Sequence, residues 1–285
     1  MLSAVNQSLS TFDPNSIISR FNQGAENVAA DSFFVDVFTK AVEVSEISDG
    51  AFDITIAPIV NAWGFGFEKH ETVNAQIIDS LMQFVGMQNV YLDDGIIKRK
   101  KPGVMLNVSA IAKGYGVDVV ANYLKNSGIK NFMVEIGGEI VTGGVNKKGN
   151  MWRIAINSPT DDISLDNRQF TMILQLSGKG LATSGNYRNF HVIDGKKQGH
   201  TIDPRTGYPV QTSVLSATII APDCMTADAF ATVCMVIGLE KSLKLLETVP
   251  NIEGCFIYET NNDGITDVAY TSGFEKYIFR TPTKQ

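Results

Sequence analysis

Residues 103–118 read Gly-Val-Met-Leu-Asn-Val-Ser-Ala-Ile-Ala-Lys-Gly-Tyr-Gly-Val-Asp, a strand-like run that changes into a helix-like run. The apolar positions of Met105–Val108 predict a strand, and Ser109 is a residue type that caps helices, so we expect a helix over Ala110–Asn126. The first turn of a helix presents unpaired N–H groups that suit an anion, and Lys113 would reach the same anion. The segment predicts either a phosphate site or an ordinary strand-to-helix junction with an exposed lysine.

Two glycines, Gly114 and Gly116, remove side chains from the start of this expected helix. A ligand or a second backbone could approach closely there. The spacing matches neither the Gly-x-Gly-x-x-Gly fingerprint nor the Walker motif, so neither a Rossmann nor a P-loop site is predicted.

The composition narrows the class of protein. Of 285 residues, 44% are hydrophobic and 19% are charged, which is typical of a globular chain. A net charge of −6 leaves no basic surplus for nucleic-acid phosphates. No run approaches the roughly 18 apolar residues of a membrane-spanning helix, and the N-terminus lacks the pattern of a signal peptide. Because no repeat or linker interrupts the chain, residues 1–285 are expected to form a single domain.

Hydrophobic periodicity predicts an α+β fold with a largely antiparallel sheet. Helical patterns cover Met1–Ser8, Ser32–Ser48, Asn74–Val85, Ala110–Asn126 and Thr226–Thr248. Strand-like runs cover Phe52–Ala57, Val90–Leu92, Ile96–Arg99, Met105–Val108, Phe132–Ile136, Trp152–Ile156, Phe170–Leu176, Phe190–Ile193, Gly199–Ile202, Val214–Ile220, Cys255–Tyr258 and Thr266–Tyr270. Asp-Gly turns between strands indicate hairpins, and strand–helix–strand alternation is sparse. A doubly wound α/β fold is the alternative.

The cysteines are expected to be buried free thiols. Cys224, Cys234 and Cys255 are odd in number and lack Cys-x-x-Cys spacing. The three histidines are far apart in the sequence, so no soft-metal cluster is predicted.

The last expected helix carries a candidate pair of metal ligands. Asp228 and Thr232 are four residues apart, so both oxygen donors share one helix face. Mg²⁺ is commonly held by few protein oxygens together with bound phosphates. We expect the carboxylate to face the surface. The alternative is plain N-terminal capping, with Thr226 as the cap and Asp228 favouring the helix dipole.

A histidine and a hydroxyl-rich segment form a third candidate cluster. Thr183-Ser184-Gly185 is expected to be a turn that presents hydroxyls and bare backbone to a ligand. His200 is expected to end a strand just before the Asp203-Pro204 turn, where an imidazole could serve as a general base. The alternative is a structural histidine. Phe52, Trp63 and Phe65 could stack on a flat ring or simply fill a core.

Taken together, these segments resemble the FAD:protein FMN transferase (ApbE-like) family, formerly described as thiamine-biosynthesis lipoproteins. The matching segments occur in the family's order along nearly the whole chain: Leu9–Asn22, Phe52–Gly66, Asn107–Asp118, Ile136–Glu139, Ala182–Tyr187, His200–Pro209 and Asp228–Thr232.

The resemblance implies an ApbE-like fold that binds FAD and Mg²⁺ and transfers FMN to a Thr or Ser hydroxyl of a target flavoprotein, releasing AMP. It implies that Asp228, Thr232 and the backbone carbonyl of Ala110 hold the metal, and that His200 is the base. It implies a flavin site lined by Phe12, Phe52, Asp53, Ile54, Asn107, Lys113, Thr183, Ser184, Thr201 and Ile202.

Three residues depart from the family's usual pattern. Asn107 replaces a frequent Asp, Ala231 replaces an occasional second Asp, and Phe12 replaces a frequent Tyr. The chain also starts inside the family's first helix, so the upstream signal or lipobox and a first strand are expected to be missing.

The resemblance further implies acceptors among flavin-carrying subunits of membrane redox complexes. The implied setting is the periplasmic side of the inner membrane, with a lipid anchor in the full-length protein. Two alternative functions remain at this point. One is a metal-dependent FAD pyrophosphatase, in which water replaces the protein hydroxyl. The other is a non-catalytic FAD-binding carrier.

Overall fold

The computed structural model describes residues 1–66, 73–158, 170–185, 190–193, 196–260 and 265–281. The chain divides into two compact units. Unit 1 contains Met1–Ala112 and Ile202–Val210, and unit 2 contains Lys113–Thr201 and Gln211–Gln285.

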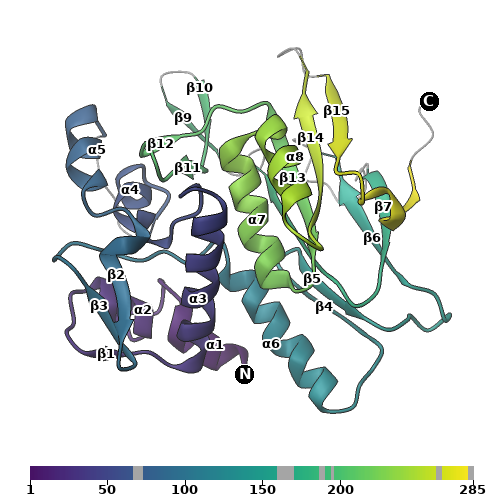
Figure 1. Cartoon of the computed structure of the whole chain (residues 1–285), viewed down its shortest axis with the longest axis horizontal. Coiled ribbons are helices and arrows are strands. Elements are labelled where there is room, and N and C mark those ends of the chain that lie inside the picture. The colour runs from purple at the N-terminus through teal and green to yellow at the C-terminus, as the bar shows by residue number, and fades with distance from the viewer. Residues whose placement is uncertain (67–72, 159–169, 186–189, 194–195, 261–264, 282–285) are drawn as a thin grey trace. The chain divides into compact units, whose positions relative to one another are not determined.

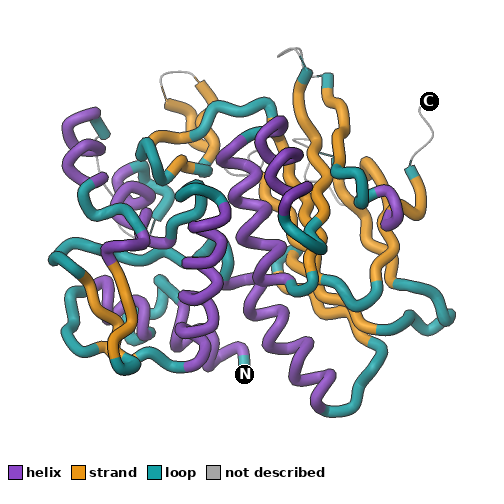
Figure 2. Tube along the Cα trace, viewed as in Figure 1, coloured by secondary structure: helices purple, strands orange, loops and turns teal. Residues whose placement is uncertain are grey.

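Unit 1 is mostly helical, with two small antiparallel sheets (Figures 1 and 2). Its helices are α1 (Leu2–Leu9), α2 (Ile17–Asn22), α3 (Ser32–Ile47), η1 (Ile54–Ile56), α4 (Ala57–Ala62), α5 (Ala75–Met82) and η2 (Met87–Asn89). Its strands are β1 (Val28–Ala29), β2 (Val90–Asp93), β3 (Ile96–Arg99), β11 (Ile202–Asp203) and β12 (Tyr208–Pro209). The strand order is β1-β3-β2 in one sheet, and β11 pairs with β12 in the other.

Unit 2 contains long helices, two larger sheets and a separate hairpin. The helices are α6 (Ala112–Asn126), α7 (Cys224–Ile237), α8 (Leu239–Thr248) and η4 (Glu275–Tyr277). The strands are β4 (Phe132–Ile136), β5 (Glu139–Gly143), β6 (Trp152–Asn157), β7 (Phe170–Leu176), β8 (Gly180–Gly185), β9 (Phe190–Ile193), β10 (Lys196–Gly199), β13 (Val214–Ala221), β14 (Glu253–Glu259), β15 (Thr266–Tyr270) and β16 (Ile278–Arg280). The hairpin is formed by β9 and β10.

The two larger sheets of unit 2 pack face to face. One has the order β15-β14-β13-β8-β5-β4 and the other has the order β16-β7-β6, with antiparallel pairing throughout. Buried side chains of both sheets form one core, including Leu181 and Ile220 from the larger sheet and Leu174 from the smaller one. Helix α7 packs on the other face of the larger sheet, against β8 and β13 (Figure 1). These observations confirm the α+β prediction.

Helices α6 and α7 cap each other. The first-turn N–H of Gly114 in α6 donates to Asp228 Oδ2 in α7, at 2.9 Å. In return, the carboxylate of Asp118 in α6 accepts from the N–H groups of Cys224 (2.9 Å) and Met225 (2.7 Å), at the start of α7. The first-turn N–H groups of a helix have no acceptor within their own helix. Here a carboxylate from each helix accepts from such N–H groups of the other helix.

Gly114 allows the two helices to approach this closely. A Cβ atom at position 114 would lie 2.3 Å from the carbonyl oxygen of Cys224 and 2.8 Å from Asp228 Cβ. The glycine that the sequence marked for close approach therefore meets a second backbone in this structure.

Several element predictions are wrong. Residues 52–57 form no strand, because the Asp53 side chain accepts from the N–H of Thr55 and starts η1, which leads into α4. Met105–Val108 is also not a strand, since the Asn22 amide side chain bonds both backbone groups of Leu106 instead. Ser109 does not cap α6, which begins at Ala112.

Two further boundaries differ from the sequence prediction. The helix expected over Thr226–Thr248 divides at Gly238, whose φ of 77° ends α7 before α8 begins. Thr183-Ser184-Gly185 is not a turn but the end of strand β8, paired with β13. The three cysteines are buried free thiols, as expected. Across the described ranges, no helix is long and apolar enough to cross a membrane.

Candidate functional site

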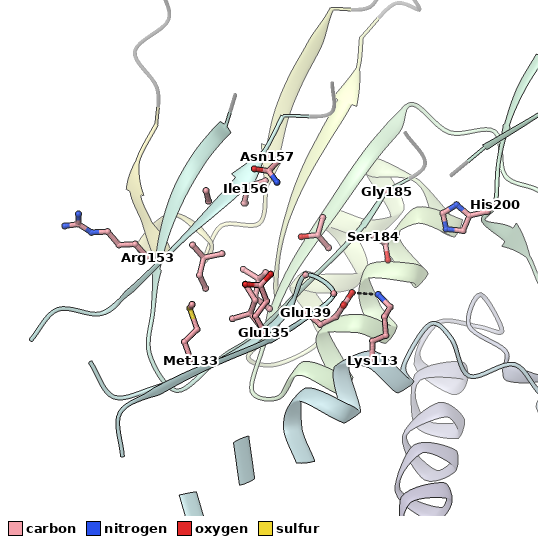
Figure 3. Close-up of a pocket in the computed structure, with 17 residues that line it drawn as sticks. Lys113, Met133, Glu135, Glu139, Arg153, Ile156, Asn157, Ser184, Gly185 and His200 are labelled. Carbon is pink, nitrogen blue, oxygen red and sulfur yellow. Dashed lines mark hydrogen bonds and ion pairs between the residues drawn. The ribbon is translucent and has the colours of Figure 1, made fainter. Parts of the chain in front are cut away.

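One cavity in unit 2 brings together several of the predicted site residues. Its volume is about 540 Å³. It is lined by four of them and by a carboxylate that was not predicted: Lys113, Thr183, Ser184, His200 and Glu139. The side chains of these residues come from α6, β8, the segment after β10 and the start of β5 (Figure 3).

Lys113 and Glu139, which both line this cavity, form an ion pair. Lys113 Nζ bonds Glu139 Oε1, and the lysine side chain is 52% exposed whereas that of the glutamate is 3% exposed. Burial lowers the pKa of Lys113, but the carboxylates of Asp228 and Glu139 raise it more, so its net pKa is raised. The ammonium therefore stays charged and open to the cavity, where a phosphate could contact it.

Glu139 is a site residue that the motif analysis did not single out. It follows the tight Gly137-Gly138 turn between β4 and β5, and both glycines have positive φ. Its Oε2 atom is buried without a hydrogen-bond partner in the described structure. The Gly-Gly-Glu sequence was the signal that could have identified it, because a buried carboxylate after such a turn needs a cationic partner.

Asp228 is buried, not surface-facing as predicted. The residue is 3% exposed, and its Oδ2 atom accepts a hydrogen bond from the Gly114 N–H. Burial raises its pKa to about 7, which Lys113 partly opposes and Glu139 reinforces. The alternative interpretation, with Thr226 as the helix cap, is also wrong, because Asp223 caps α7 by accepting from the Thr226 N–H at 2.7 Å. Asp228 is therefore free of the N-terminal capping role in its own helix.

Thr232 lies one turn after Asp228 and faces strand β8. Its Oγ1 is 3.5 Å from Ser184 Oγ. Successive side chains of β8 point to opposite faces, so the neighbouring Thr183 faces the other way and its Oγ1 bonds Thr218 Oγ1 at 2.9 Å. The hydroxyl groups of Thr183 and Ser184, both predicted site residues, therefore lie on opposite faces of strand β8.

His200 lies between β10 and β11 rather than at the end of a strand. Strand β10 ends at Gly199 and β11 begins at Ile202. The imidazole is half-buried and lines the cavity beside Ser184 and Gly185 (Figure 3). The next residue, Thr201, is half-buried.

The remaining predicted flavin and metal residues belong to unit 1. The Asn107 N–H donates to the Ile54 carbonyl at 2.7 Å, which brings two of them together. Asp53 lines a second cavity of about 780 Å³, and burial raises its pKa. Phe52 and Ile202 are buried, whereas Phe12 is 82% exposed. Ala110, the predicted carbonyl ligand, lies in the turn before α6.

The roles assigned to these residues, in metal binding, flavin binding and proton transfer, stay predictions. Among the described residues, no group of three or more His, Cys, Asp and Glu could hold a metal ion by itself. The predicted Mg²⁺ site differs from such a cluster because it relies on one carboxylate, one hydroxyl and ligand oxygens.

Asp118, whose carboxylate links α6 to α7, makes the free energy of unfolding depend on pH. Burial raises its pKa to about 6, against the lowering effect of the N–H groups of Cys224 and Met225. Between about 4, where an ordinary aspartate titrates, and about 6, the folded protein keeps a proton that the unfolded chain has lost. The Asp118 contribution to the free energy of unfolding is therefore complete below this window and is lost as the pH rises through it.

We expect Asp118→Asn to remove this pH dependence and to lower stability by about 1–3 kcal/mol, because an amide has only one acceptor for the two N–H groups. Denaturant unfolding at several pH values across the window measures both effects. Asp79→Asn, at an exposed position of α5, is the matched control and should change neither. An unchanged pH slope in Asp118→Asn would contradict the assignment.

Comparison with known proteins places this structure in a family. The sequence model of the ApbE family matches residues 1–256. The chain belongs to the ApbE family. The FAD:protein FMN transferase of Vibrio cholerae serotype O1 is 38% identical to this ApbE-family chain over 282 residues, covering 98% of this chain and 82% of the relative. That of Escherichia coli K12 is 32% identical over 271 residues, covering 92% and 75%.

Solved ApbE structures share the fold. The flavin transferase ApbE from Vibrio cholerae has a TM-score of 0.84 at 36% identity, covering 97% of this chain and 87% of that chain. The ApbE protein of Thermotoga maritima has a TM-score of 0.84 at 27% identity, covering 96% and 87%. The resemblance stated from the motifs and the ApbE-like fold are thus confirmed.

Proposed function

We propose that this ApbE-family chain transfers the FMN moiety of FAD to a Ser or Thr hydroxyl of a target flavoprotein and releases AMP. Relatives with 32–38% identity carry the name FAD:protein FMN transferase, which supports the reaction class. The observation that carries the proposal is the single cavity that gathers a cation, hydroxyls and a half-buried imidazole.

The proposed step exchanges one P–O bond for another. The oxygen of the acceptor hydroxyl forms a bond to the FMN phosphorus, and the bond from that phosphorus to the bridging oxygen of the pyrophosphate breaks. AMP leaves with this oxygen and its electron pair. His200 accepts the proton of the attacking hydroxyl.

The residues of unit 2 suit these tasks. The Lys113 ammonium stays charged beside two carboxylates and can stabilise charge on the phosphates. Thr183 and Ser184 both line the same cavity, although their hydroxyls lie on opposite faces of β8. Among the unit 1 residues, the exposed ring of Phe12 is available for stacking on the isoalloxazine, and Asp53 and Asn107 offer polar groups.

The donors around Asp228 fit a hard divalent cation. Asp228 is a buried carboxylate whose pKa is raised, and Glu139, whose charge acts on it, has a carboxylate oxygen that is buried without a partner in the described part of the chain. We infer that Asp228 and Thr232 hold Mg²⁺, with Ala110 as a third ligand by resemblance. When bound, Mg²⁺ would neutralise charge on the pyrophosphate and the AMP leaving group.

The proposed acceptors are flavin-carrying subunits of membrane redox complexes, and the proposed setting is the periplasmic side of the membrane. Both proposals rest on the family resemblance.

Incubation with FAD, Mg²⁺ and an acceptor protein tests the function. Transfer gives AMP and a fluorescent flavin–protein adduct in equal amounts. Free FMN with AMP, in place of the adduct, would identify a pyrophosphatase, and intact FAD would identify a carrier. Either of these results would overturn the proposal.

We expect Lys113→Ala to weaken FAD binding about 10- to 150-fold, which corresponds to the roughly 1.5–3 kcal/mol of a charge-assisted phosphate contact. Riboflavin, which lacks the phosphates, should lose little affinity. Equilibrium fluorescence titration with both ligands gives the comparison.

Two controls complete this test. Lys125→Ala, in the last turn of the same helix, should leave both affinities unchanged. Lys113→Ala also leaves the buried Glu139 carboxylate without its cationic partner. The double variant with Glu139→Gln removes this uncompensated charge. Equal losses for FAD and riboflavin in both the single and double variants would exclude the phosphate contact.

A further inference from the structure

The unit 2 cavity extends well beyond the residues assigned to FAD, metal and proton transfer. One end is lined by Ser184, Gly185 and His200. The other end lies between strands β4 and β6 (Figure 3). It is lined by residues that no predicted role uses: Met133, Glu135, Arg153, Ala155 and Asn157. We call this end the β4–β6 groove.

Both strands of the groove are edge strands. In the described structure β6 pairs only with β7, and β4 pairs only with β5. The outer edge of β6 therefore presents backbone N–H and C=O groups without a strand partner among the described residues. Such an edge is a template for pairing with another extended chain.

The side chains of β6 alternate in a way that leaves this edge accessible. Ile154 and Ile156 are buried in the core between the two sheets. Arg153 and Ala155 are exposed on the opposite side. The Arg153 guanidinium stacks on Phe279, 3.7 Å from the ring centroid. The strand is thus anchored by its inward residues, and the small side chain of Ala155 does not obstruct an added strand.

The floor of the groove is the uncovered part of the six-stranded sheet. Glu135 is opposite Ile140 in the β4–β5 register, so both side chains point toward the three-stranded sheet. Ile140 is covered there, but Glu135 is exposed and Met133 is 40% exposed. Glu135 forms no ion pair with any described residue. A carboxylate and an apolar side chain are therefore available to a ligand.

We propose that the β4–β6 groove binds an extended segment of the acceptor flavoprotein as an added strand along β6. This inference rests on the proposed transferase function. A segment lying there would bring a Ser or Thr toward the His200 end of the same cavity. The six residues of β6 span about 20 Å, enough to align several acceptor residues.

Charge and polarity define the acceptor segment further. The Glu135 carboxylate, which has no ion-pair partner among the described residues, favours a basic side chain, and Met133 favours an apolar one. Backbone pairing would supply affinity for many sequences, while these two side chains would supply selectivity.

Cross-linking at Ala155 tests the location. Ala155→Cys can be labelled selectively with a benzophenone maleimide, because the three native cysteines are buried. The probe is a protein that the Vibrio cholerae relative flavinylates, with its accepting hydroxyl residue changed to Ala. Illumination should join it to the labelled protein, and excess unlabelled acceptor should compete. Asp267→Cys, exposed on the opposite edge strand β15, is the matched control and should not cross-link.

Kinetics test the charge assignment. Glu135→Lys should raise the KM for the acceptor about tenfold through charge repulsion, with a smaller increase for Glu135→Gln. The kcat and the Kd for FAD should stay at the parental values. A changed Kd for FAD would instead make the groove a flavin site and overturn the proposal.

The outcomes separate this inference from the function on which it rests. If the parent flavinylates the acceptor but cross-linking fails and Glu135→Lys keeps the parental KM, the groove assignment is wrong and the transferase function stands. If the parent leaves the acceptor unmodified while the Vibrio cholerae relative modifies it, the proposed function fails.

Discussion

His200→Asn is expected to lower the rate of FMN transfer by about 10²–10⁴-fold, the usual contribution of one positioned proton acceptor. The imidazole is half-buried at the cavity beside Ser184, so the substitution changes a group that lines the proposed reaction site. Asparagine has a similar size but does not accept a proton. Single-turnover measurement of the flavin–protein adduct gives the rate.

The pH dependence distinguishes a base from a structural histidine. The parental rate should fall as the pH is lowered, because a protonated imidazole cannot accept the hydroxyl proton. This acid limb should be absent from the variant, while FAD affinity and thermal stability stay near the parental values. Loss of stability and FAD affinity together would assign His200 a structural role, and a parental transfer rate would remove it from the mechanism.

Asp228→Asn is expected to abolish Mg²⁺-dependent turnover without unfolding the protein. The amide oxygen can still accept from the Gly114 N–H, so the link between α6 and α7 persists. The negative charge that a divalent cation requires is lost. Asp228→Ala should be equally inactive and less stable, by about 1–3 kcal/mol for the lost hydrogen bond.

The raised pKa of Asp228 predicts the direction in which the stability of the metal-free protein changes with pH. Because its folded-state pKa is about 7, the metal-free protein loses stability as the pH rises from the ordinary aspartate range through that value. Asp228→Asn should remove this loss and be more stable than the metal-free parent above this pH. Calorimetry with and without Mg²⁺ provides the measurement. A Mg²⁺-induced rise in Tm that persists in Asp228→Asn would contradict the ligand assignment.

The local patterns predicted the long elements of the fold well. Helix α3 covers Ser32–Ile47 where Ser32–Ser48 was expected, and β4 and β7 have the predicted bounds. These segments combine a clear apolar period with a local end signal, such as the Asp31 cap of α3. Their pattern and their tertiary environment favour the same structure.

Elsewhere, distant partners decided the structure. The Thr-Ser-Gly sequence at the end of strand β8 predicted a turn, because this composition is typical of loops. The sequence did not show how the strand packs: Gly180, at its start, permits contact with the backbone of Asp223 and Cys224. Asp228 looked exposed because one helix in isolation does not show what packs on it. The Lys113–Glu139 pair joins residues 26 positions apart, and no helical or strand period indicates such a contact.

The mutual capping of α6 and α7 constrains how this protein can be recombined with its relatives. The donor at Gly114 and the acceptor at Asp118 lie in helix α6. Their hydrogen-bond partners, Asp228 and Cys224, lie in helix α7, about a hundred residues later in the sequence. A chimera that exchanges only one of these two helices would combine helices whose facing surfaces come from different sequences. Exchanging residues 112–126 together with 223–237 transfers the whole interlocked pair as one module.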